Sequence, residues 1–588
     1  ILNNTLEQAD VLKKPFLKIL DPACGCGFFL IKAYDILKEK FQAALPMLRE
    51  KYADEPYIIK KDGEFKRING KEYWQKDNLH YHILKHCIYG ADIDENALWL
   101  CSASLLSKDR IKYEENVNTI YCDSLVRWEK NYDREQINQE LKEYRLIYGI
   151  NNLRYDKMEY VDREKAEEIL RRNKFWSNQY DYIVGNPPYV GHKKLTMDYK
   201  EWLIDEYKEV FKDKSDLSYC FYQRALEVAE DKGVIAFISS RYFMESPTGR
   251  NLREYLKNNS KIVQIVDFYG ENIFKGIGVA TAIFFISSDF HDDNLVKVWK
   301  YQGGKINNID LKDFDVFTVK QAKLLEDRWI LISDEKRDML DKIEARCKIR
   351  LGDLVESFQG IITGCDKAFV MDEYMMEILS IEKDLLKPWI KNSHVDRYSI
   401  KESSLKLIYS NWIDEPHKYP NSMMHIAKYR DRLKGRRECK KGMRLWYQLQ
   451  WGRDPELFIK DKIVYPFKSK SNRFALDRSG RFCSADVYSF ILKESIEGYT
   501  LPFLLGVLNS KIYEFYFKLF AKKMGSGIYD YYPNTVMDLK IPDYEACKDI
   551  ESISLELIKL CEYGTSPKDI KIAEEEIDNV LRNYFGLC

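Results

Sequence analysis

The chain has 588 residues, of which 45% are hydrophobic, so it can form two or more domains and is not largely disordered. Its 93 basic and 93 acidic residues cancel, but a neutral total does not exclude nucleic acid, because local clustering of charge decides that. No stretch is long and apolar enough to cross a bilayer, and the 13 cysteines include no CxxC pair. This cysteine usage argues against zinc ribbons and disulfide scaffolds and favours a reducing cytoplasm.

The first half of the chain alternates short apolar runs with amphipathic stretches such as Asp216–Glu230. This rhythm predicts a doubly wound α/β sheet. The last two runs have no clear helix between them, and we expect them to form an antiparallel closing pair. The expected strands are Phe16–Leu20, Cys87–Ile93, Thr119–Cys122, Tyr182–Val184, Val234–Ser239, Ile262–Phe268 and Ala280–Ile286.

Two charged, weakly periodic segments interrupt this rhythm at about residues 38–78 and 128–178, and we interpret them as surface insertions, partly helical. The pattern weakens from about Asp289 to Ile332, which predicts a link between domains. We therefore expect one domain over residues 1–332 and a second over residues 333–588, which ends in a broken helical segment. Because the first residue is Ile1 rather than Met, we expect the chain to continue upstream.

A glycine-containing loop follows the first strand and reads Asp21-Pro22-Ala23-Cys24-Gly25-Cys26-Gly27. Glycines at such a junction let the backbone turn tightly and approach a ligand. A dinucleotide fold would offer GxGxxG for a pyrophosphate, but here an acidic residue opens the loop and the third glycine is replaced. A carboxylate attracts cations and repels phosphates, so S-adenosylmethionine fits this loop better than NAD does.

Two further strands end in carboxylates. Asp92, followed by Ile93, is a candidate for the ribose hydroxyls, whereas Asp94 is expected to cap the next helix. Asp123, followed by Ser124, could accept a hydrogen bond from an adenine amino group. An Asp after a strand is a helix cap more often than a ligand, but three acidic strand ends after such a loop argue against coincidence.

The fourth strand runs into Asn186-Pro187-Pro188-Tyr189. The two prolines hold the backbone extended and fix the direction of the Pro187 carbonyl. This carbonyl and the Asn186 side-chain oxygen can each accept one hydrogen of a planar amino group, which polarises its nitrogen for attack on a methyl group. Tyr189 can stack on the ring that carries the amino group. The alternative, a rigid strand-ending turn without a ligand, is disfavoured by the loop that precedes it.

The loop DPACGCGF followed by GNPPY resembles the gamma-class N6-adenine DNA methyltransferases of the TaqI and Eco57I type. The resemblance implies a Rossmann-like class I SAM-dependent methyltransferase domain with a mixed seven-stranded sheet, followed by a C-terminal mixed α+β target-recognition domain. It assigns catalysis to Asn186, Pro187, Pro188 and Tyr189, and it places Phe274 and Tyr189 on the two faces of a flipped base. The implied S-adenosylmethionine-binding residues are Asp21, Pro22, Ala23, Gly25, Gly27, Asp92, Ile93, Asp123, Ser124 and Asn186.

The segment Phe358–Phe369 resembles the start of the target-recognition domain in that family. Nearly the whole chain resembles an orphan adenine methyltransferase of sporulating clostridia. That resemblance implies double-stranded DNA with an A-rich, non-palindromic site as the substrate and no companion endonuclease. We also expect a monomer that binds no metal and no membrane. Two departures are that the tyrosine-containing motif upstream of the first strand is absent and that the insertion at 128–178 matches no family motif.

A base inside a duplex cannot reach a deep crevice, so this chemistry requires a flipped base and anchors for the DNA backbone. The densest basic run, Lys428–Arg453, is poor in acids and interleaved with aromatic residues, which predicts DNA contact; a solvated charged face is the alternative. The predicted DNA-binding residues are Lys193, Lys194, Arg436, Arg437, Lys440, Lys441, Arg444, Trp446, Tyr447, Lys468, Asn472, Arg473, Lys522 and Lys523.

Three other functions stay open from the sequence. The same tetrapeptide can polarise an adenine of RNA or a protein glutamine, although enzymes of that kind are usually compact. A fused restriction-modification enzyme is the second, and no D…ExK nuclease arrangement stands out in the chain. A binding module that has lost catalysis is the third, and the intact loop, acids and tetrapeptide argue against it.

Overall fold

The computed structural model describes residues 1–587 except 62–63, 110–116, 129–162, 272, 275–277, 292, 304–309, 495–497, 525–526 and 565. The chain divides into two compact units, Ile1–Ser333 and Asp334–Cys588. The predicted boundary between residues 332 and 333 lies next to this division. Most of the predicted insertion at 128–178 lies outside the described residues, apart from the helix α7 near its end.

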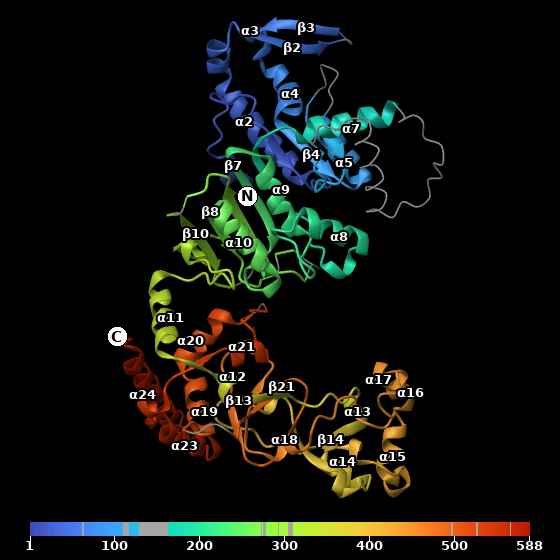
Figure 1. Ribbon diagram of the computed structural model, residues 1–588, viewed down its shortest axis with the longest axis vertical. Coiled ribbons are helices and arrows are strands. Elements are labelled where there is room, and N and C mark those ends of the chain that lie inside the picture. The colour runs from blue at the N-terminus through green and yellow to red at the C-terminus, as the bar shows by residue number, and fades with distance from the viewer. Residues whose placement is uncertain are drawn as a thin grey trace. The chain divides into compact units, whose positions relative to one another are not determined.

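In the described part of the first unit, one sheet has nine strands in the order β11-β10-β8-β9-β7-β6-β1-β4-β5 (Figure 1). The strands are β1 (Ile19–Asp21), β4 (Ile88–Asp92), β5 (Asn118–Tyr121), β6 (Tyr180–Gly185), β7 (Ala229–Ser240), β8 (Lys261–Asp267), β9 (Thr281–Ser287), β10 (Leu295–Tyr301) and β11 (Phe314–Lys320). Strands β5, β4, β1, β6 and β7 are parallel to one another. Strand β9 is antiparallel to both β7 and β8, which confirms the predicted closing pair.

Strands β10 and β11 correct the expectation that residues 289–332 only link two domains, and they extend the predicted seven-stranded sheet. β10 is parallel to β8, and β11 is antiparallel to β10. Along the first half of β10 buried and exposed residues alternate, with Leu295 exposed and Val296 buried. Strands near an open edge read as mixed polar and apolar sequence rather than as an apolar run, which is why the sequence pattern appeared to weaken here.

Helices cover both faces of this sheet, because successive residues of a strand point to opposite sides. Ile19 and Val184 pack with residues of α2, α4 and α5, whereas Leu20 and Ile183 pack with residues of α9 and α10. The helices are α1 (Leu2–Leu6), α2 (Phe28–Lys51), α3 (Gly70–Tyr73), α4 (Leu79–His82), α5 (Glu95–Leu106), α7 (Arg163–Trp176), α8 (Met197–Glu206), α9 (Ser218–Val228) and α10 (Arg250–Asn259). Within the described ranges, no helix has the length and apolar composition needed to span a membrane.

The predicted insertion at 38–78 is only partly an insertion. Helix α2 continues through its first part to Lys51, and an antiparallel hairpin of β2 (Pro56–Lys61) and β3 (Glu64–Asn69) follows. Tyr57 and Ile59 are buried on one face of the hairpin, whereas Ile58 on the other face is 64% exposed.

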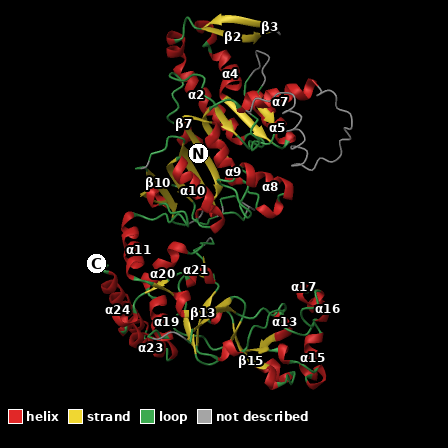
Figure 2. Cartoon of the chain, viewed as in Figure 1, coloured by secondary structure: helices red, strands yellow, loops and turns green. Residues whose placement is uncertain are grey.

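The second unit mixes short strands and helices, as the sequence predicts (Figure 2). Two four-stranded sheets have the orders β13-β21-β17-β19 and β14-β16-β15-β20. Their strands are β13 (Val355–Gln359), β14 (Val370–Asp372), β15 (Leu386–Ile390), β16 (Leu405–Ile408), β17 (Lys462–Pro466), β19 (Ala475–Asp477), β20 (Phe482–Cys483) and β21 (Val487–Leu492). Shorter pairings join β12 (Ile349–Arg350) to β23 (Lys540–Ile541) and β18 (Lys468–Ser469) to β22 (Tyr529–Asp530).

The predicted helical C-terminus is confirmed as α23 and α24, which are broken before Pro567. The helices of the second unit are α11 (Asp334–Arg346), α12 (Leu351–Leu354), α13 (Asp366–Phe369), α14 (Glu373–Ile378), α15 (Pro420–Ala427), α16 (Arg430–Lys434), α17 (Arg437–Lys440), α18 (Glu456–Ile459), α19 (Leu501–Asn509), α20 (Lys511–Phe520), α21 (Pro533–Met537), α22 (Tyr544–Cys547), α23 (Asp549–Glu562) and α24 (Pro567–Phe585).

Candidate active site

The loop between β1 and α2 turns on two glycines. Gly25 and Gly27 have φ angles of 49° and 84°, which side chains disfavour. A methyl group on Gly27 would also lie 2.4 Å from the Cys101 Sγ of α5. The loop therefore needs glycine at position 27 both for its turn and for its close packing against the next helix.

Asp21 is buried at the carboxyl end of β1, with 1% of its surface exposed. Its Oδ1 accepts the Ala23 N–H at 3.1 Å, which holds the start of the loop. Burial raises the pKa of this carboxyl to about 8, and the charge of Asp92 raises it further. A buried carboxyl beside the half-buried Asp92 carboxylate is stabilised by a bound cation, so the residues present fit the ammonium group of S-adenosylmethionine.

Asp92 ends β4 and closes the other side of the loop. Its Oδ2 accepts the Gly25 N–H at 2.7 Å, and its Oδ1 accepts the Asp94 N–H at 2.9 Å. Ile93 beside it is 64% exposed, so an apolar side chain faces solvent next to the carboxylate. Asp94 accepts the N–H groups of Asn96 and Ala97 at the start of α5, which confirms its predicted capping role.

Asp123 and Ser124 follow β5 and are both buried. The Asp123 carboxylate accepts the Leu125 N–H at 2.9 Å and the Tyr199 hydroxyl at 2.8 Å, and burial raises its pKa. Each carboxylate oxygen keeps a second lone pair for a ligand. The Ser124 hydroxyl donates to the Pro22 carbonyl at 2.6 Å, so this predicted cofactor residue holds the loop in place.

The tetrapeptide after β6 stands at the same edge of the sheet. Pro187 is buried, whereas Asn186 is exposed and its side chain is accessible to a substrate. The Tyr189 hydroxyl lies 2.5 Å from the Asn186 Oδ1 and 3.2 Å from the Ile238 carbonyl oxygen. Burial raises the pKa of Tyr189, so the hydroxyl stays protonated and donates. The Asn186 oxygen retains one lone pair for a substrate hydrogen.

Gly185 joins the two halves of the site. A methyl group here would lie 2.6 Å from the Asp21 Oδ1, so the residue before Asn186 packs directly on the buried carboxyl. The structure thus brings together the ends of β1, β4 and β6, while Ser124 ties the end of β5 to the same loop.

Phe274, predicted to face the target base, is half-buried between β8 and β9. Residues 272 and 275–277 of its predicted motif lie outside the described residues. The segment leads into Thr281, which pairs with Ser240 at the carboxyl end of β7. Lys193 and Lys194 are exposed in a short 3-10 turn, His192–Lys194, just after the tetrapeptide.

The second unit corrects several predicted DNA contacts. Arg436 is buried, and its guanidinium donates to the carbonyl oxygens of four residues, which leaves it no freedom to reach a phosphate. These residues are Thr363, Leu433, Trp446 and Gln448. Gly364, in the segment predicted to open the recognition domain, has no Cβ, and a methyl group there would lie 2.7 Å from the Arg436 Cδ.

Three other predicted contacts are also buried, namely Tyr447, Asn472 and Lys523. Asn472 donates to the Leu508 carbonyl at 2.6 Å and accepts the Tyr531 hydroxyl at 2.8 Å. The half-buried Arg473 donates to Ser469, Asn392 and the Val395 carbonyl, so its donors are also engaged inside the fold. These residues hold the second unit together, and sequence alone could not separate them from exposed basic residues.

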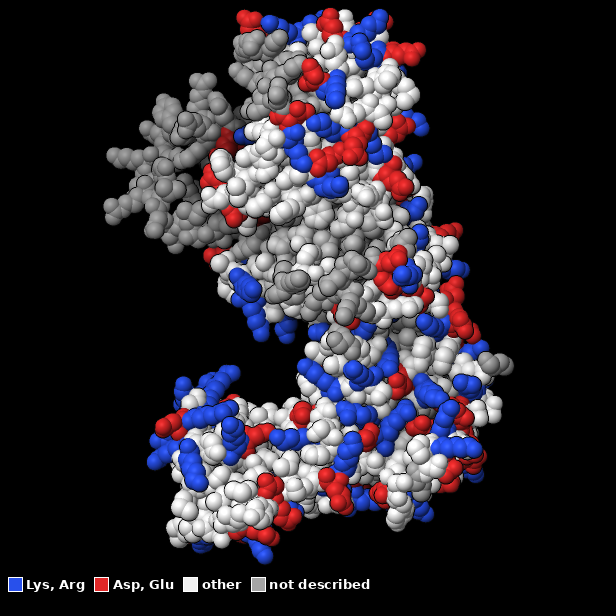
Figure 3. Space-filling model, turned by 180° about the vertical axis from the view of Figure 1, so that it is seen from behind, with Lys and Arg blue, Asp and Glu red and all other residues white. Residues whose placement is uncertain are grey.

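The remaining predicted contacts stay accessible. Arg437, Lys440, Lys441, Lys468 and Lys522 are exposed. Arg444 lies over the Trp451 ring at 5.8 Å, and the half-buried Trp446 lies beneath Arg430 at 5.1 Å. Figure 3 shows blue Lys and Arg side chains crowded at the end of the second unit that carries α16 and α17. The predicted basic run also carries exposed cations at Lys428, Arg430, Arg432 and Lys434.

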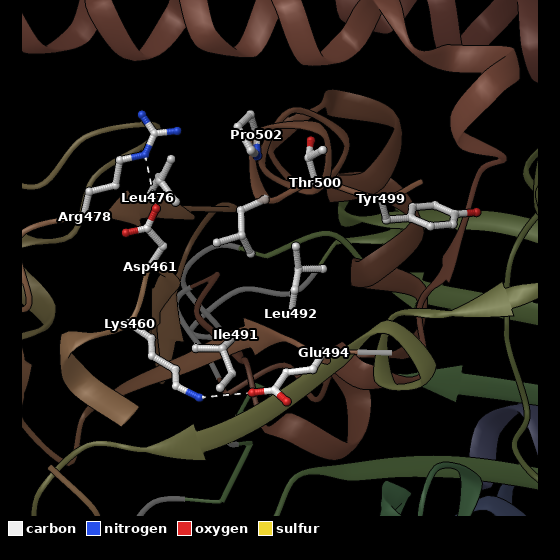
Figure 4. A pocket seen from close by; sticks show the side chains of 11 residues that line it. Lys460, Asp461, Leu476, Arg478, Ile491, Leu492, Glu494, Tyr499, Thr500 and Pro502 are labelled. Carbon is white, nitrogen blue, oxygen red and sulfur yellow. Dashed lines mark ion pairs between the residues drawn. The ribbon is translucent and has the colours of Figure 1, made fainter. Parts of the chain in front are cut away.

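A pocket of about 480 Å³ lies elsewhere in the second unit, between β19, β21 and the start of α19 (Figure 4). Ion pairs of 3.9 Å between Lys460 and Glu494 and of 3.6 Å between Arg478 and Asp461 flank it. None of the predicted site residues lines this pocket, and we assign it no role.

Sequence reasoning missed two residues of the site. Gly185 carried a signal, since a glycine directly before the tetrapeptide marks a close approach of another group. Tyr199, on α8, carried none, because nothing in the local pattern connects it with the distant Asp123 that it hydrogen-bonds. Among the described residues, no three His, Cys, Asp or Glu side chains are arranged to hold a metal ion.

Two family models match the chain. Residues 86–274 match the Eco57I restriction-modification methylase family, and residues 387–541 match the TaqI-like C-terminal specificity domain. The chain is 24% identical over 529 residues to the type II methyltransferase M.BanIII of Aneurinibacillus aneurinilyticus, which covers 82% of this chain and 89% of that protein. It is 23% identical over 565 residues to the type II restriction enzyme and methyltransferase RM.Eco57I of Escherichia coli, with 86% of this chain matched but only 51% of that protein.

The fold is also similar to a solved structure. The type IIL restriction-modification enzyme MmeI superposes with a TM-score of 0.60 at 17% identity, covering 100% of this chain and 72% of that one. The chain thus carries a region similar to Eco57I-type methylases and a region similar to TaqI-like specificity domains. Its α/β fold is that of a methyltransferase, and its methyl donor is S-adenosylmethionine.

Proposed function

We propose that this protein is a site-specific DNA methyltransferase that modifies the N6 amino group of adenine. The observation that carries the proposal is the alignment of Asp21, Asp92 and Asn186 at the carboxyl ends of β1, β4 and β6, with Gly185 against Asp21. Open α/β sheets bind ligands at this edge, where the strand order reverses. The site for the methyl donor and the site for the amino group that receives the methyl therefore lie at the same edge of the sheet.

The chemistry follows from the groups at that edge. S-adenosylmethionine, when bound, supplies an electrophilic methyl group. The free lone pair of the Asn186 oxygen and the Pro187 carbonyl each accept one hydrogen of the substrate amino group, which increases the electron density on its nitrogen. Tyr189 offers its ring to the base while its hydroxyl holds the Asn186 side chain at 2.5 Å. No general base is needed before transfer, because the proton is lost from the methylated nitrogen afterwards.

DNA as the substrate is supported by the second unit and by relatives. Residues 387–541 match a specificity-domain family, and α16 and α17 carry exposed cations suited to phosphates. Among the relatives, the adenine-specific methyltransferase BrxX of Escherichia coli O9:H4 is 23% identical over 290 residues, which cover 42% of this chain and 23% of that protein. Adenine in duplex DNA must be flipped to reach this edge, and the exposed Lys193 and Lys194 beside the tetrapeptide suit contact with the target strand.

The resemblance of the chain to CamA, the orphan adenine methyltransferase of sporulating clostridia, supports a finer proposal. We infer an A-rich, non-palindromic recognition site, a monomeric enzyme and no companion endonuclease. Sequencing of DNA methylated by the purified protein would read the site directly. A palindromic site modified on both strands would overturn this part while leaving the chemistry intact.

The substrate class is tested by transfer of label from methyl-labelled S-adenosylmethionine. Duplex DNA, RNA and a protein extract are incubated separately with the enzyme, and the labelled product is digested to its monomers. We expect label on N6 of adenine from DNA. Label confined to RNA or to protein glutamine would overturn the proposal.

A further inference from the structure

Two large apolar side chains stand exposed inside the basic region of the second unit. Met443 is 56% exposed and Leu445 is 53% exposed, in the turn that follows α17. We call residues 442–445 the tip. Single exposed apolar side chains are common on protein surfaces, but two in one turn, set within a basic run, can form a contact surface for a partner.

The backbone holds the tip in one shape. Gly442 has a φ of 69° and donates to the Cys439 carbonyl at 3.0 Å, and the Met443 N–H donates to the Glu438 carbonyl at 2.9 Å. The Leu445 N–H donates to the Gln448 Oε1 at 3.0 Å. The chain therefore presents Met443 and Leu445 outward from a fixed turn rather than from a loose loop.

Arg436 fixes the backbone that follows this turn. Its buried guanidinium donates to the Trp446 carbonyl at 2.9 Å and to the Gln448 carbonyl at 2.8 Å, directly after the tip. A buried cation with its donors satisfied by carbonyls fixes geometry, because each carbonyl would otherwise lack a partner. Arg436, which the sequence analysis predicted to bind DNA, therefore supports the backbone next to the tip instead.

The surroundings of the tip select the chemistry of its partner. Lys440 and Lys441 are exposed immediately before it, and Arg444 lies within it. The nearest acid in the sequence, Glu438, accepts a hydrogen bond from the Gln450 side chain at 3.0 Å. Apolar side chains ringed by cations fit a polyanion that has an apolar interior, which describes a DNA groove with phosphates outside and base edges or steps inside.

We propose that the tip is a wedge that enters a groove of duplex DNA, with Met443 and Leu445 against the bases and Lys440 and Lys441 on the flanking phosphates. This inference rests on the proposed DNA substrate and names the residues that distinguish its site from other sequences. Apolar contact with bases depends on sequence through shape and stacking, whereas phosphate contact does not. The two pairs of residues should therefore affect binding in different ways.

The test compares two double variants on two duplexes at several salt concentrations. The site is first read from DNA methylated by the wild-type enzyme, and then a duplex with that site and a scrambled duplex are titrated. M443S/L445S should weaken binding to the site duplex about tenfold and to the scrambled duplex less than about threefold, without changing the salt slope. K440A/K441A should weaken both duplexes alike and lower the slope of log affinity against log salt by about 1.8.

Met424 provides a matched control. It lies on α15, is 64% exposed and stands outside the tip, so M424S should bind both duplexes as the wild type does. The melting temperature of each variant checks folding, and the replaced side chains are exposed. Equal binding of the site duplex by M443S/L445S and wild type would overturn the wedge, as would equal losses on both duplexes. A wild-type enzyme that leaves no methyl group on DNA would overturn the proposed function itself, before any variant is compared.

Discussion

The carboxyl edge of the first unit and the basic end of the second unit differ in the sign of their charged residues and in how far these are buried. At the edge, Asp21 and Asp123 are buried with at most 4% of their surface exposed, and backbone N–H groups hold their oxygens. At the basic end, the Lys and Arg residues of α16 and α17 are exposed, whereas Arg436, between the two helices, is buried. The first region keeps its carboxyl groups away from water, which fits the proposed small cationic cofactor, whereas the second leaves its cations in solvent, which fits the proposed DNA substrate.

This difference teaches which substitutions damage the fold and which damage binding. Buried charged groups are costly to disturb because their partners lose hydrogen bonds in a water-poor place. Exposed cations contribute little to stability and much to the salt dependence of DNA binding. The variants below therefore separate structure from function within each region.

The largest effect is expected for Asn186→Ala. Removing the side-chain oxygen leaves the substrate amino group with one acceptor, so the rate of methyl transfer should fall at least about a hundredfold. Binding of S-adenosylmethionine and DNA should persist, since the Asn186 side chain is hydrogen-bonded to Tyr189 rather than to the cofactor loop. Single-turnover kinetics with pre-bound DNA measure the rate, and turnover within threefold of wild type would contradict the assigned role.

Arg436→Met should mainly destabilise the second unit. The carbonyls of Trp446 and Gln448 lose this donor, and those of Thr363 and Leu433 keep only a backbone N–H, so the expected loss is about 3 kcal/mol of unfolding free energy. The triple variant R437A/K440A/K441A replaces exposed neighbours and should unfold like wild type while binding DNA with a smaller salt slope. Denaturant unfolding separates the two, and an Arg436→Met variant as stable as wild type would refute the structural role.

Gly185→Ala should weaken cofactor binding by about tenfold, because the new methyl group would lie 2.6 Å from the Asp21 carboxylate and displace it. Gly191→Ala is the matched control, since a methyl group there meets nothing within 4 Å. Calorimetric titration with S-adenosylmethionine compares them. Equal affinities would show that the contact between β6 and Asp21 is not needed for binding.

Asp21 should make the ligand-free protein less stable as the pH rises. Its folded pKa is about 8, well above the ordinary 3.8, so between these values the folded state holds a proton that the unfolded state has lost. Unfolding free energy therefore falls with rising pH, and Asp21→Asn should remove about 1–2 kcal/mol of that fall between pH 6 and 8. Unfolding curves of both proteins at each pH measure the difference, and parallel pH profiles would contradict the raised pKa.

The smallest effect is expected for Tyr189→Phe. The ring remains for stacking, and only the hydroxyl that holds the Asn186 oxygen is lost. Methyl transfer should slow by about threefold, whereas Tyr189→Ala should lose most of the activity along with the ring. Transfer rates of the two variants on the same duplex test this order. A Phe variant as slow as the Ala variant would make the hydroxyl the essential group.

Much of the first unit could be predicted because its site lies where strands end. A parallel strand is an apolar run, and the residue after it must lie at the carboxyl edge, so the positions of Asp92, Asp123 and Asn186 followed from the strands alone. Strand β10, next to the edge strand β11, could not be predicted in this way, because Lys297 and Lys300 interrupt its apolar residues.

The exposed basic residues of the second unit could not be predicted, because the local sequence does not determine which side chains are buried. Arg436 and Arg437 are adjacent and chemically identical, yet the first is buried under four carbonyls and the second is exposed. Only long-range contacts, such as that between Arg436 and Thr363, decide which residue turns inward. The exposure of Met443 and Leu445 in the tip could not be predicted for the same reason, since an apolar residue in a basic run is expected to be buried.

Nucleoside analysis of DNA treated with the enzyme and S-adenosylmethionine is the most direct test of the proposed adenine methylation. Wild-type protein should yield N6-methyladenine in duplex DNA, and Asn186→Ala should yield none above background under the same conditions. Methylation of cytosine N4 alone, or a product found only in RNA or protein, would contradict the proposal that this edge methylates adenine in DNA.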